Sequence, residues 1–545
     1  MQAKIISSLN KCFPDEMMAS KKELKKATFL KNERYSFIIP FQHEDPRITK
    51  EIVYFKIDEP FLSFANVYLV ENIPSMLPVY PETFDDNYLR TEPGLYPDLL
   101  KPITSETRLT CNHTMRSLWI ELDTDGKLSG NQTFSGAFYN EAGEKIQELS
   151  LEIEIIDALL PDQKTTYSQW FYPDCLMQYY NLEMYSEEHW AIIERFMENA
   201  HRYGQDMILT PALSPELDTY VGGYRPSTQL TKITLENGKY TFDFSLLKRW
   251  IDLAQKIGFK YFEIAHLFSQ WGAKFCPQVW ATVDGEEKRI FGWDTEALSD
   301  EYKNFLSQYI PKLLEFFDAL GLGDKCYFHV SDEPHEDNIE QYKQNTEFIR
   351  PLIVGRKTID ALSNPAFLGT VDIPVCVIDR LEPFLERKVE NLWGYYCCSQ
   401  WDKVSNRFFA MTSSRTRIIG AQIYKYDLKG FLHWGYNFYN NQFSYNTLNP
   451  FICSDGECFA PSGDTYSVYP GEGGKPWPSL RQVLFFDALQ DIRAMQLLEE
   501  LKGKEYVINL IDEGIEPITF KEYPKSEEYL LNLRNRINRA IKESI

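Results

Sequence analysis

The chain has 545 residues, a length that favours two or more domains over a single core. Its 79 acidic residues outnumber the 57 Lys and Arg residues and give a formal net charge of −22. Because such a chain repels phosphate backbones and anionic membranes, we expect neither nucleic acid nor a membrane as a partner.

The cysteines and the N-terminal segment bear on the cellular location. The ten cysteines are scattered without paired CxxC metal motifs, so free thiols in a reducing compartment are expected. The segment MQAKIISSLNKCFPDEMM has no continuous apolar run before a small-residue cleavage site, and no apolar stretch of the chain is long enough to cross a membrane. These features predict a cytoplasmic protein.

Period-two patterns dominate residues 1–158, of which we interpret the first 34 as an extension. Short apolar segments are separated by Asp, Asn, Gly and Pro turns and show no helical periodicity between them. Several such strands predict an N-terminal antiparallel β-sandwich. The expected strands are residues 35–41, 51–57, 64–70, 117–124, 132–140 and 148–156.

Strands and helices alternate in residues 174–502, after a linker over residues 159–173. A helix should begin after Ser186 and stop at Gly204, because Ser caps helix N-termini and Gly ends helices. Eight strands are the number that closes a (β/α)8 barrel, so the fold class is α/β with a TIM-like barrel behind the sandwich. The expected barrel strands are residues 174–180, 206–214, 261–268, 327–334, 358–362, 374–379, 393–398 and 431–437. Residues 503–545 should form a mixed or helical C-terminal extension.

The long connections lie on one side of this predicted barrel. Connections from helix to strand are short, whereas the irregular segments 214–242, 271–298 and 436–478 each follow a strand and precede a helix. In a barrel, such loops share the C-terminal face, where the active sites of this fold lie. This asymmetry predicts that the C-terminal face binds the substrate.

Two adjacent carboxylates, Asp332 and Glu333, end the fourth predicted barrel strand and precede Pro334, which cannot continue a ladder. They therefore face the loops of the C-terminal side. Their repulsion tends to raise the pKa of one of them, which suits a general acid near neutral pH. A helix cap beside a surface charge is the purely structural interpretation of the same pair.

The adjacency of the pair limits its chemistry. Retaining glycosidases place two carboxyl groups about 5–5.5 Å apart on opposite sides of the scissile bond, which consecutive residues can scarcely do. A substrate-assisted reaction fits better, in which the 2-acetamido oxygen attacks the anomeric carbon and forms an oxazolinium ion. Asp332 would then stabilise the acetamido group, and Glu333 would protonate the leaving oxygen and later activate water.

A resemblance to a known family is carried by three segments. They are HVSDEP at 329–334, GFLHWGYNFYNNQ at 430–442, and PSGDTYSVYPG at 461–471 leading into PSLRQVLFFDALQDI at 478–492. With the order of sandwich and barrel, the chain resembles glycoside hydrolase family 123, the β-N-acetylgalactosaminidases and their relatives, over nearly its whole length. The resemblance implies a β-sandwich, a catalytic (β/α)8 barrel, and an Asp-Glu pair that uses the acetamido group. In this chain the pair is Asp332 as stabiliser and Glu333 as acid and base.

Aromatic and amide residues near the ends of the last strands are candidate sugar contacts. Trp434 would form the floor under the apolar face of the sugar, although a buried core Trp fits the same pattern. Asn437 would hydrogen-bond ring hydroxyls, or serve only as a turn residue. Tyr395 and Tyr396 alternate in direction, so only one of them faces the site, where its phenol would donate to the acetamido oxygen.

Three further residues complete the candidate substrate contacts. His266 and Trp271 follow the third predicted strand, and Asp464 lies in one of the resembling segments. A hydrogen-bonded structural role is the alternative for His266, and for Arg481 at a helix start we expect a structural salt bridge. The eight His residues are dispersed without ligand spacing, so we predict neither a metal nor another cofactor.

The sequence therefore predicts a retaining exo-glycoside hydrolase that acts on a carbohydrate with a terminal β-linked N-acetylhexosamine, with N-acetylgalactosamine favoured. Two alternatives remain open. Another exo-glycosidase on the same barrel would use different loop carboxylates, such as Asp464 or Asp402. A non-catalytic carbohydrate-binding protein would use sandwich and barrel for recognition alone.

Overall fold

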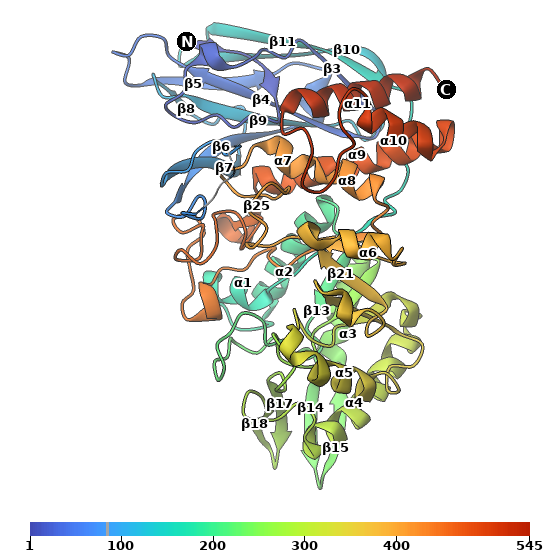
Figure 1. The fold of residues 1–545 in the computed structure, drawn as a ribbon. Coiled ribbons are helices and arrows are strands. Elements are labelled where there is room, and N and C mark those ends of the chain that lie inside the picture. Colours follow the sequence, from blue (N-terminus) through green and yellow to red (C-terminus); the bar gives the residue numbers. More distant parts are fainter. Residues whose placement is uncertain (83–84, 86) are drawn as a thin grey trace.

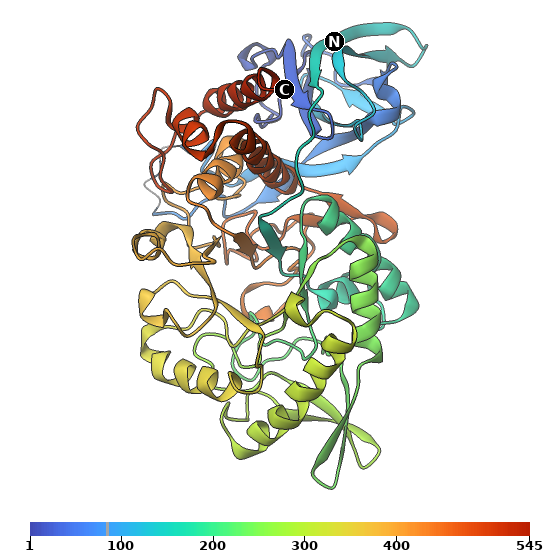
Figure 2. The same cartoon turned by 90° about the vertical axis from the view of Figure 1, so that its right-hand side faces the viewer.

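The computed structural model describes residues 1–82, 85 and 87–545. An N-terminal two-sheet sandwich lies at one end of the molecule, a barrel surrounded by helices at the other, and C-terminal helices between them (Figures 1 and 2). Both chain ends lie at the sandwich end (Figure 1). In the part of the chain that is described, no helix combines the length and the apolar character needed to cross a bilayer.

The sandwich confirms all six expected strands. One sheet has the order β1-β4-β9-β6-β7 with β2 paired to β4, and the other has the order β3-β11-β10-β5-β8. Neighbours are antiparallel except for β3, which runs parallel to β11. The strands are β1 (Gln2–Ala3), β2 (Ile6–Ser7), β3 (Lys26–Leu30), β4 (Arg34–Gln42), β5 (Glu51–Ile57), β6 (Ala65–Ser75), β7 (Gly94–Pro102), β8 (Leu109–Cys111), β9 (Arg116–Asp123), β10 (Gly130–Asn140) and β11 (Lys145–Ile156).

The interpretation of the first 34 residues as an extension was wrong. They supply β1, β2 and β3 to the two sheets, and Ile5, Phe29 and Leu30 are buried there. These strands have only two to five residues, which is too short for a period-two pattern to be recognised.

The barrel consists of eight parallel strands in the order β12-β23-β22-β21-β20-β19-β16-β13. The first and last strands of this order meet through Tyr167 and Asp206. The Asp206 N–H donates to the Tyr167 carbonyl over 3.2 Å, and the Tyr167 N–H donates to the Asp206 carboxylate over 2.9 Å. The strands are β12 (Thr166–Gln169), β13 (Met207–Thr210), β16 (Tyr261–Ile264), β19 (Cys326–Phe328), β20 (Lys357–Ala361), β21 (Ile373–Val377), β22 (Trp393–Tyr395) and β23 (Gly430–His433).

Seven of the expected barrel strands are present, but the first one was misplaced. Residues 174–180 belong to helix α1 (Pro173–Tyr180), and the first strand, β12, lies inside the segment expected as a linker, 159–173. A short apolar run fits a buried strand and a buried helix equally well, and Pro173 at the first helical position decides for the helix. β12 looks like a linker because its buried residues include the polar Gln169, whose side-chain oxygen accepts from Arg407 over 2.7 Å.

Helices surround the barrel, α9 and α11 contact strands of the sandwich, and α10 packs against both of these helices. As expected, α2 begins after Ser186, whose hydroxyl accepts from the His189 N–H, and the chain turns at Gly204 with φ 93°. The helices are α1, α2 (Glu187–Arg202), α3 (Ser245–Ile257), α4 (Asp300–Ala319), α5 (Ile339–Ile349), α6 (Glu382–Glu386), α7 (Ser413–Arg417), α8 (Ile419–Lys425), α9 (Leu480–Lys502), α10 (Lys504–Asp512) and α11 (Glu527–Lys542).

Arg481 on α9 joins the barrel to the sandwich. Its guanidinium donates twice to the carboxylate of Asp98 on β7, with both nitrogen–oxygen distances at 2.8 Å, and both side chains are buried. The expected structural salt bridge of Arg481 is therefore confirmed.

The loops after β13 and β16 are less irregular than the sequence suggested. Each contains a hairpin, β14 (Lys232–Glu236) with β15 (Lys239–Asp243), and β17 (Val279–Val283) with β18 (Glu286–Phe291). β14 also pairs with β17, so the two loops form one four-stranded sheet that projects from the barrel (Figure 1). This pairing ties two of the three long loops together beside the C-terminal mouth of the barrel.

Candidate active site

The backbone that carries Asp332 is fixed by the segment that follows β16. Beyond the end of β19, the chain stays in register with that segment. The Phe268 N–H donates to the Val330 carbonyl over 3.1 Å, and the Trp271 N–H donates to the Asp332 carbonyl over 2.9 Å. Asp332 and Glu333 therefore lie at the C-terminal mouth of the barrel, as the sequence predicted.

Glu333 adopts a left-handed backbone conformation with φ 40°. In an extended chain, two successive side chains point to opposite faces, so an Asp-Glu pair would not serve one site. The left-handed turn at Glu333 ends that alternation. Such conformations cost energy for non-glycine residues and concentrate at functional sites.

Tyr395 at the end of β22 holds the Glu333 carboxylate. Its hydroxyl donates to Glu333 Oε1 over 2.5 Å and lies 3.3 Å from the hydroxyl of Ser363. Burial and the nearby negative charge of Glu333 raise the pKa of Tyr395 well above its usual value, so the phenol stays a donor. Of the two tyrosines left open by the sequence, Tyr395 is the one at the mouth, because Tyr396 packs against Phe431 on the opposite face of the strand.

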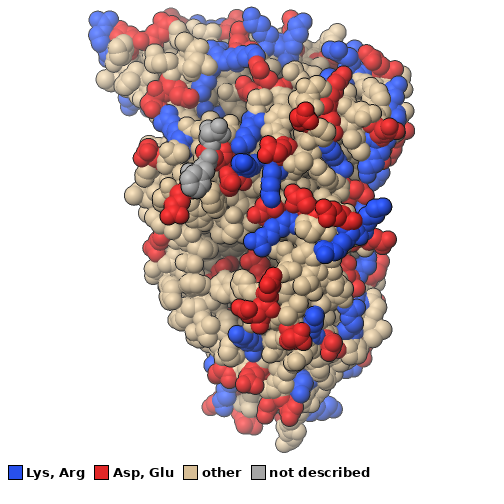
Figure 3. All heavy atoms as spheres, viewed as in Figure 1, with Lys and Arg blue, Asp and Glu red and all other residues tan. Residues whose placement is uncertain are grey.

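A cleft of about 510 Å³ opens beside Glu333 and Tyr395. Its other walls come from the loops after β19 to β22 and include Ser363, Arg380 and Gln400. Figure 3 shows a hollow on this side of the molecule with acidic atoms inside it and charged side chains to its right. The cleft is polar and is large enough for a sugar unit.

The pKa of Asp332 is raised well above that of an ordinary carboxyl. Burial is the largest cause, and the negative charges of Glu333 and of Asp218 raise the pKa of Asp332 further, while His329 opposes them. Asp332 therefore keeps its proton to a higher pH than an ordinary carboxyl does. The raised pKa thus belongs to the residue assigned as stabiliser.

Asp218 is a third carboxylate at the mouth that the sequence did not single out. It lies in the loop after β13, where its N–H donates to Gln270 Oε1 over 2.6 Å and its carbonyl accepts from the Ser444 hydroxyl over 2.7 Å. Burial and the charge of Glu333 raise the pKa of Asp218 to about 6, although Arg225 opposes the shift. The feature of the sequence that could have identified Asp218 was its place on a long loop of the C-terminal face.

Trp434 and Asp464 form a supporting pair. Trp434 is half-buried, and its indole N–H donates to Asp464 Oδ2 over 2.9 Å. Asp464 is buried, and burial raises its pKa to about 7. The geometry thus lets Asp464 orient Trp434, whereas direct contact of Asp464 with a substrate is not supported.

Two other predicted contacts lie away from the mouth. Asn437 is buried, and its amide bonds to both the N–H and the carbonyl of Tyr172, at 2.8 and 2.9 Å. Since both polar groups of Asn437 are occupied, the predicted bonds to ring hydroxyls are not supported. His266 is also buried and stacks on His329 with ring centroids 4.3 Å apart. Trp271, in contrast, lies on the rim of the mouth with 36% of its surface exposed.

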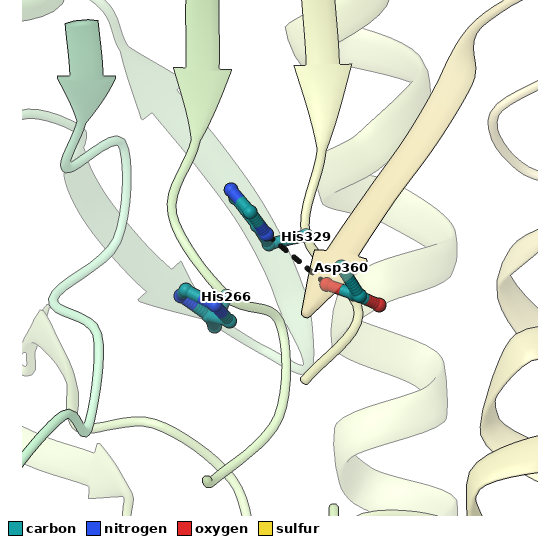
Figure 4. A group of neighbouring side chains, drawn as sticks. All are labelled: His266, His329 and Asp360. Atoms are coloured by element: carbon teal, nitrogen blue, oxygen red, sulfur yellow. Dashed lines mark hydrogen bonds and ion pairs between the residues drawn. The ribbon is translucent and has the colours of Figure 1, made fainter. Parts of the chain in front are cut away.

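A charged network fills the barrel interior below the pair. His329 lies between two buried carboxylates, with Nε2 2.9 Å from Glu263 and Nδ1 3.1 Å from Asp360. Figure 4 shows His329 with Asp360. Burial alone would lower the pKa of His329, but its hydrogen bonds to Asp360 and Glu263 outweigh burial and raise the pKa to about 9. Trp170 donates to Glu263 over 2.9 Å, and Tyr342 donates to Asp360 over 2.5 Å.

This network also fixes the backbone before the pair. The carboxylate of Asp360 accepts the N–H of Val330 over 3.1 Å and that of Ser331 over 3.4 Å. The segment 329–331 is thus held from below by charged hydrogen bonds and from the side by the loop after β16. The pattern HVSDEP shows the His but gives no sign of its two partners, which come from other strands.

His266, His329 and Asp360 are the one described group whose ligand atoms come close enough for a shared metal ion, within 4.8 Å of one another. An ion bound to an imidazole lies in the plane of the ring, along a nitrogen lone pair. The two rings are stacked at 22°, so their planes do not meet at one ion (Figure 4). Both nitrogens of His329 already have carboxylate partners, so the arrangement fits a hydrogen-bond network better than a metal site.

A solved structure shares the whole architecture. The family 123 glycoside hydrolase from Clostridium perfringens, studied for the details of glycolipid glycan hydrolysis, superposes with a TM-score of 0.73 at 15% sequence identity, over 99% of this chain and 97% of that one. A family 2 glycosyl hydrolase from Bacteroides cellulosilyticus (8% identity, 77% and 46% of the two chains) has a TM-score of 0.28. A family 5 mannosidase from Rhizomucor miehei (11% identity, 62% and 95%) has a TM-score of 0.33.

One of the two sequence comparisons agrees with this likeness. No curated protein matches the chain. The family model described as the catalytic domain of glycoside hydrolase 123 matches residues 170–498, which include the barrel strands from β13 to β23 and most of α9. The chain therefore belongs to glycoside hydrolase family 123.

Proposed function

We propose that this glycoside hydrolase is a retaining exo-enzyme that removes a terminal β-linked N-acetylhexosamine, with N-acetylgalactosamine favoured. The observation that carries the proposal is the adjacency of Asp332 and Glu333 at one mouth, with Glu333 held by Tyr395. Consecutive carboxyl groups do not enclose a sugar ring from both faces, so the nucleophile is best supplied by the acetamido group of the substrate.

In the first step, the acetamido oxygen bonds to the anomeric carbon as the bond to the leaving oxygen breaks. Glu333 gives its proton to that oxygen, and Asp332 accepts a hydrogen bond from the acetamido N–H, which becomes more acidic as the oxazolinium ion forms. The bound N–H favours the ionised form of Asp332 and so offsets the raised pKa of this carboxyl in the empty site.

In the second step, water attacks the anomeric carbon from the face that the leaving group has left, and Glu333 takes its proton. The oxazolinium ring opens and restores the acetamido group. Two inversions leave the product in the β configuration. Trp434, half-buried and oriented by Asp464, would support the apolar face of the sugar.

A panel of 4-nitrophenyl glycosides tests this proposal. It should contain the β-N-acetylgalactosaminide, the β-N-acetylglucosaminide and their 2-hydroxy counterparts, each with wild type and with Glu333→Gln. Turnover confined to acetamido sugars, with a β product seen first by NMR, is the expected result. Activity on the 2-hydroxy sugars, or an α product, would reject substrate assistance. Sugar binding without turnover would indicate a carbohydrate-binding protein.

We also propose a cytoplasmic location, which the cysteines support. All ten are free thiols, and six of them are buried. Oxidising compartments favour disulfides, so this set of thiols fits a reducing one. Fractionation of cells that produce the protein, followed by detection with an antibody, would locate it directly, and recovery outside the cytoplasm would contradict the proposal.

A further inference from the structure

Four aromatic rings from three different loops form a continuous surface at the mouth. Tyr220 stacks on Tyr445 with ring centroids 4.6 Å apart at 13°, Tyr445 meets Phe443 at 6.3 Å, and Phe443 meets Trp271 at 5.7 Å. We call Tyr220, Trp271, Phe443 and Tyr445 the aromatic rim. These rings follow β13, β16 and β23, on the side of the mouth opposite to the polar cleft.

The aromatic rim is exposed although its rings are large. Tyr445 is 60% exposed, Tyr220 is 42% exposed and Trp271 is 36% exposed. Trp271 and Phe443 have φ angles of 55° and 58°, which bulky side chains rarely adopt. Backbone of this kind is retained when the surroundings impose it, and it is common at ligand clamps. Core packing does not account for rings held in this way at the surface.

Hydrogen bonds between the loops hold the aromatic rim in place. Gln270 accepts from the Asp218 N–H over 2.6 Å and donates to the Thr219 carbonyl over 3.3 Å, which ties the loop after β16 to the loop after β13. Ser444 donates to the Asp218 carbonyl over 2.7 Å and adds the loop after β23. A surface formed before binding loses little entropy when a ligand arrives.

The segments that carry the aromatic rim have no positive charge. The segments 214–223, 269–273 and 441–449 contain no Lys or Arg and are rich in Ser, Thr, Asn, Gln and Gly. In Figure 3 the surface to the left of the hollow, where these loops lie, is largely free of charged side chains, whereas the right side carries both signs. Phosphate groups require cations, so this surface does not suit a nucleic acid or a phospholipid headgroup.

We propose that the aromatic rim is a second carbohydrate subsite, which stacks on an uncharged sugar of the substrate next to the sugar whose bond is cleaved. Tyr and Trp present apolar faces with a polar tip, and the surrounding amides and hydroxyls can bond to sugar hydroxyls. Trp271 links the subsite to the reaction, because its N–H bonds to the carbonyl of Asp332. The inference rests on the proposed function and adds which loops contact the sugar beyond the cleaved bond.

The test compares two substrates with the same terminal sugar. One is methyl N-acetyl-β-galactosaminide, whose leaving group has no ring that could stack on the aromatic rim, and the other is a neutral tetrasaccharide that ends in β-linked N-acetylgalactosamine. Tyr220→Ala and Tyr445→Ala should each lower kcat/KM for the tetrasaccharide about tenfold, the scale of one ring contact, and leave kcat/KM for the methyl glycoside within about twofold.

Two variants serve as controls. Tyr445→Phe keeps the ring and should retain activity on the tetrasaccharide. Tyr506→Ala removes a tyrosine on α10, outside the rim, that is as exposed as Tyr220 (42%). Equal effects of Tyr445→Ala on both substrates, or no effect on either, would overturn the subsite. Binding to phosphatidylcholine vesicles that Tyr220→Ala abolishes, with unchanged kinetics on the tetrasaccharide, would identify a lipid surface and overturn it as well.

The subsite can be tested even if the proposed function fails. If the wild type cleaves neither substrate, isothermal titration calorimetry measures the binding of the tetrasaccharide to wild type, Tyr220→Ala and Tyr445→Ala. Binding by the wild type that weakens about tenfold in both variants supports the subsite. Equal binding by all three proteins, or none by the wild type, overturns it.

Discussion

The segment 329–333 carries two sets of charged residues, His329 and the Asp332–Glu333 pair, whose surroundings differ. His329 is buried in the barrel and is bonded to Glu263 and Asp360, so its charge is compensated. Asp332 and Glu333 lie at the mouth, where the nearby carboxylate of Asp218 adds to the repulsion. The paired charges below the mouth fix the backbone, whereas the carboxylates at the mouth remain able to interact with a substrate.

The comparison shows that the charges inside the barrel are compensated, whereas like charges lie close together at the mouth. A buried charge is tolerated only when it is paired and hydrogen-bonded, as in the network of His329. An active site needs groups whose pKa is shifted and whose interactions are completed by the substrate. A substitution in the His329 network and one in the Asp332–Glu333 pair therefore test separately the support of the backbone and the interaction with a substrate.

The largest effect should come from Glu333→Gln. Loss of the proton donor should lower kcat for substrates with poor leaving groups by about 10³-fold, the range of general acid catalysis, while binding is kept. Stopped assays on oligosaccharides, with calorimetry for binding, check this. An undiminished rate would remove Glu333 as the acid.

His329→Gln should mainly cost stability, because it leaves Glu263 and Asp360 without their shared cation. The pKa of His329 is about 9 in the folded protein, against about 6.5 for a free histidine. A raised pKa contributes stability that is complete below pH 6.5 and is lost as the pH rises through 9. The variant should therefore be less stable by about 3 kcal/mol at pH 6, and by less at pH 10.

Urea unfolding of wild type and His329→Gln at both pH values measures this difference. His113→Gln, at an exposed position in the sandwich, is the matched control and should change stability little at either pH. The same loss of stability at pH 6 and at pH 10 would mean that the charge of His329 does not contribute.

Asp332→Asn should lower kcat by about 10²-fold, the scale of a lost electrostatic contact in the transition state. The pKa of Asp332 is raised and the reaction uses its ionised form, so kcat/KM of the wild type should rise with pH above the ordinary carboxyl range. That rise should be absent in the variant. Asp402→Asn changes an exposed carboxylate and should have no effect; a large loss there would favour a glycosidase that uses other loop carboxylates.

Tyr395→Phe should have the smallest effect, a decrease in kcat/KM of about tenfold, because one hydrogen bond to the charged form of Glu333 is lost. Tyr396→Phe is the matched control, since Tyr396 faces away from the mouth, and it should behave as wild type. Equal losses in the two variants would indicate a general effect on β22 rather than a role of the Tyr395 hydroxyl.

Part of the site could be predicted from local sequence. The apolar strand before Asp332, and Pro334 after Glu333, place the pair at a strand end. Tyr395 and Tyr396 could only be reduced to alternatives, because strand alternation says that one side chain faces inward without saying which. Asn437 was misjudged because a buried side chain bonded to the backbone of Tyr172 has the same sequence signature as an exposed turn residue.

The secondary structure likewise could be predicted only where the signal is local. Strands such as Glu51–Ile57 and helices such as α2 carry their own patterns and caps, so they were predicted with accurate bounds. β12 was missed because four residues with polar side chains become a strand only when β23 supplies their hydrogen bonds. Propensity and periodicity describe a segment alone, whereas pairing depends on the partner.

By itself, the sequence determined the sandwich, the barrel, and the position of the Asp332–Glu333 pair at the end of a strand on the C-terminal face, because each depends on neighbours in the chain. Tertiary structure alone decided the rest. It brought Glu263 and Asp360 to His329, Tyr395 to Glu333, and Asp218 to the mouth, and it joined the aromatic rim from three loops. Those groups are separated by tens to hundreds of residues, and the pairing of the strands together with closure of the barrel makes them neighbours.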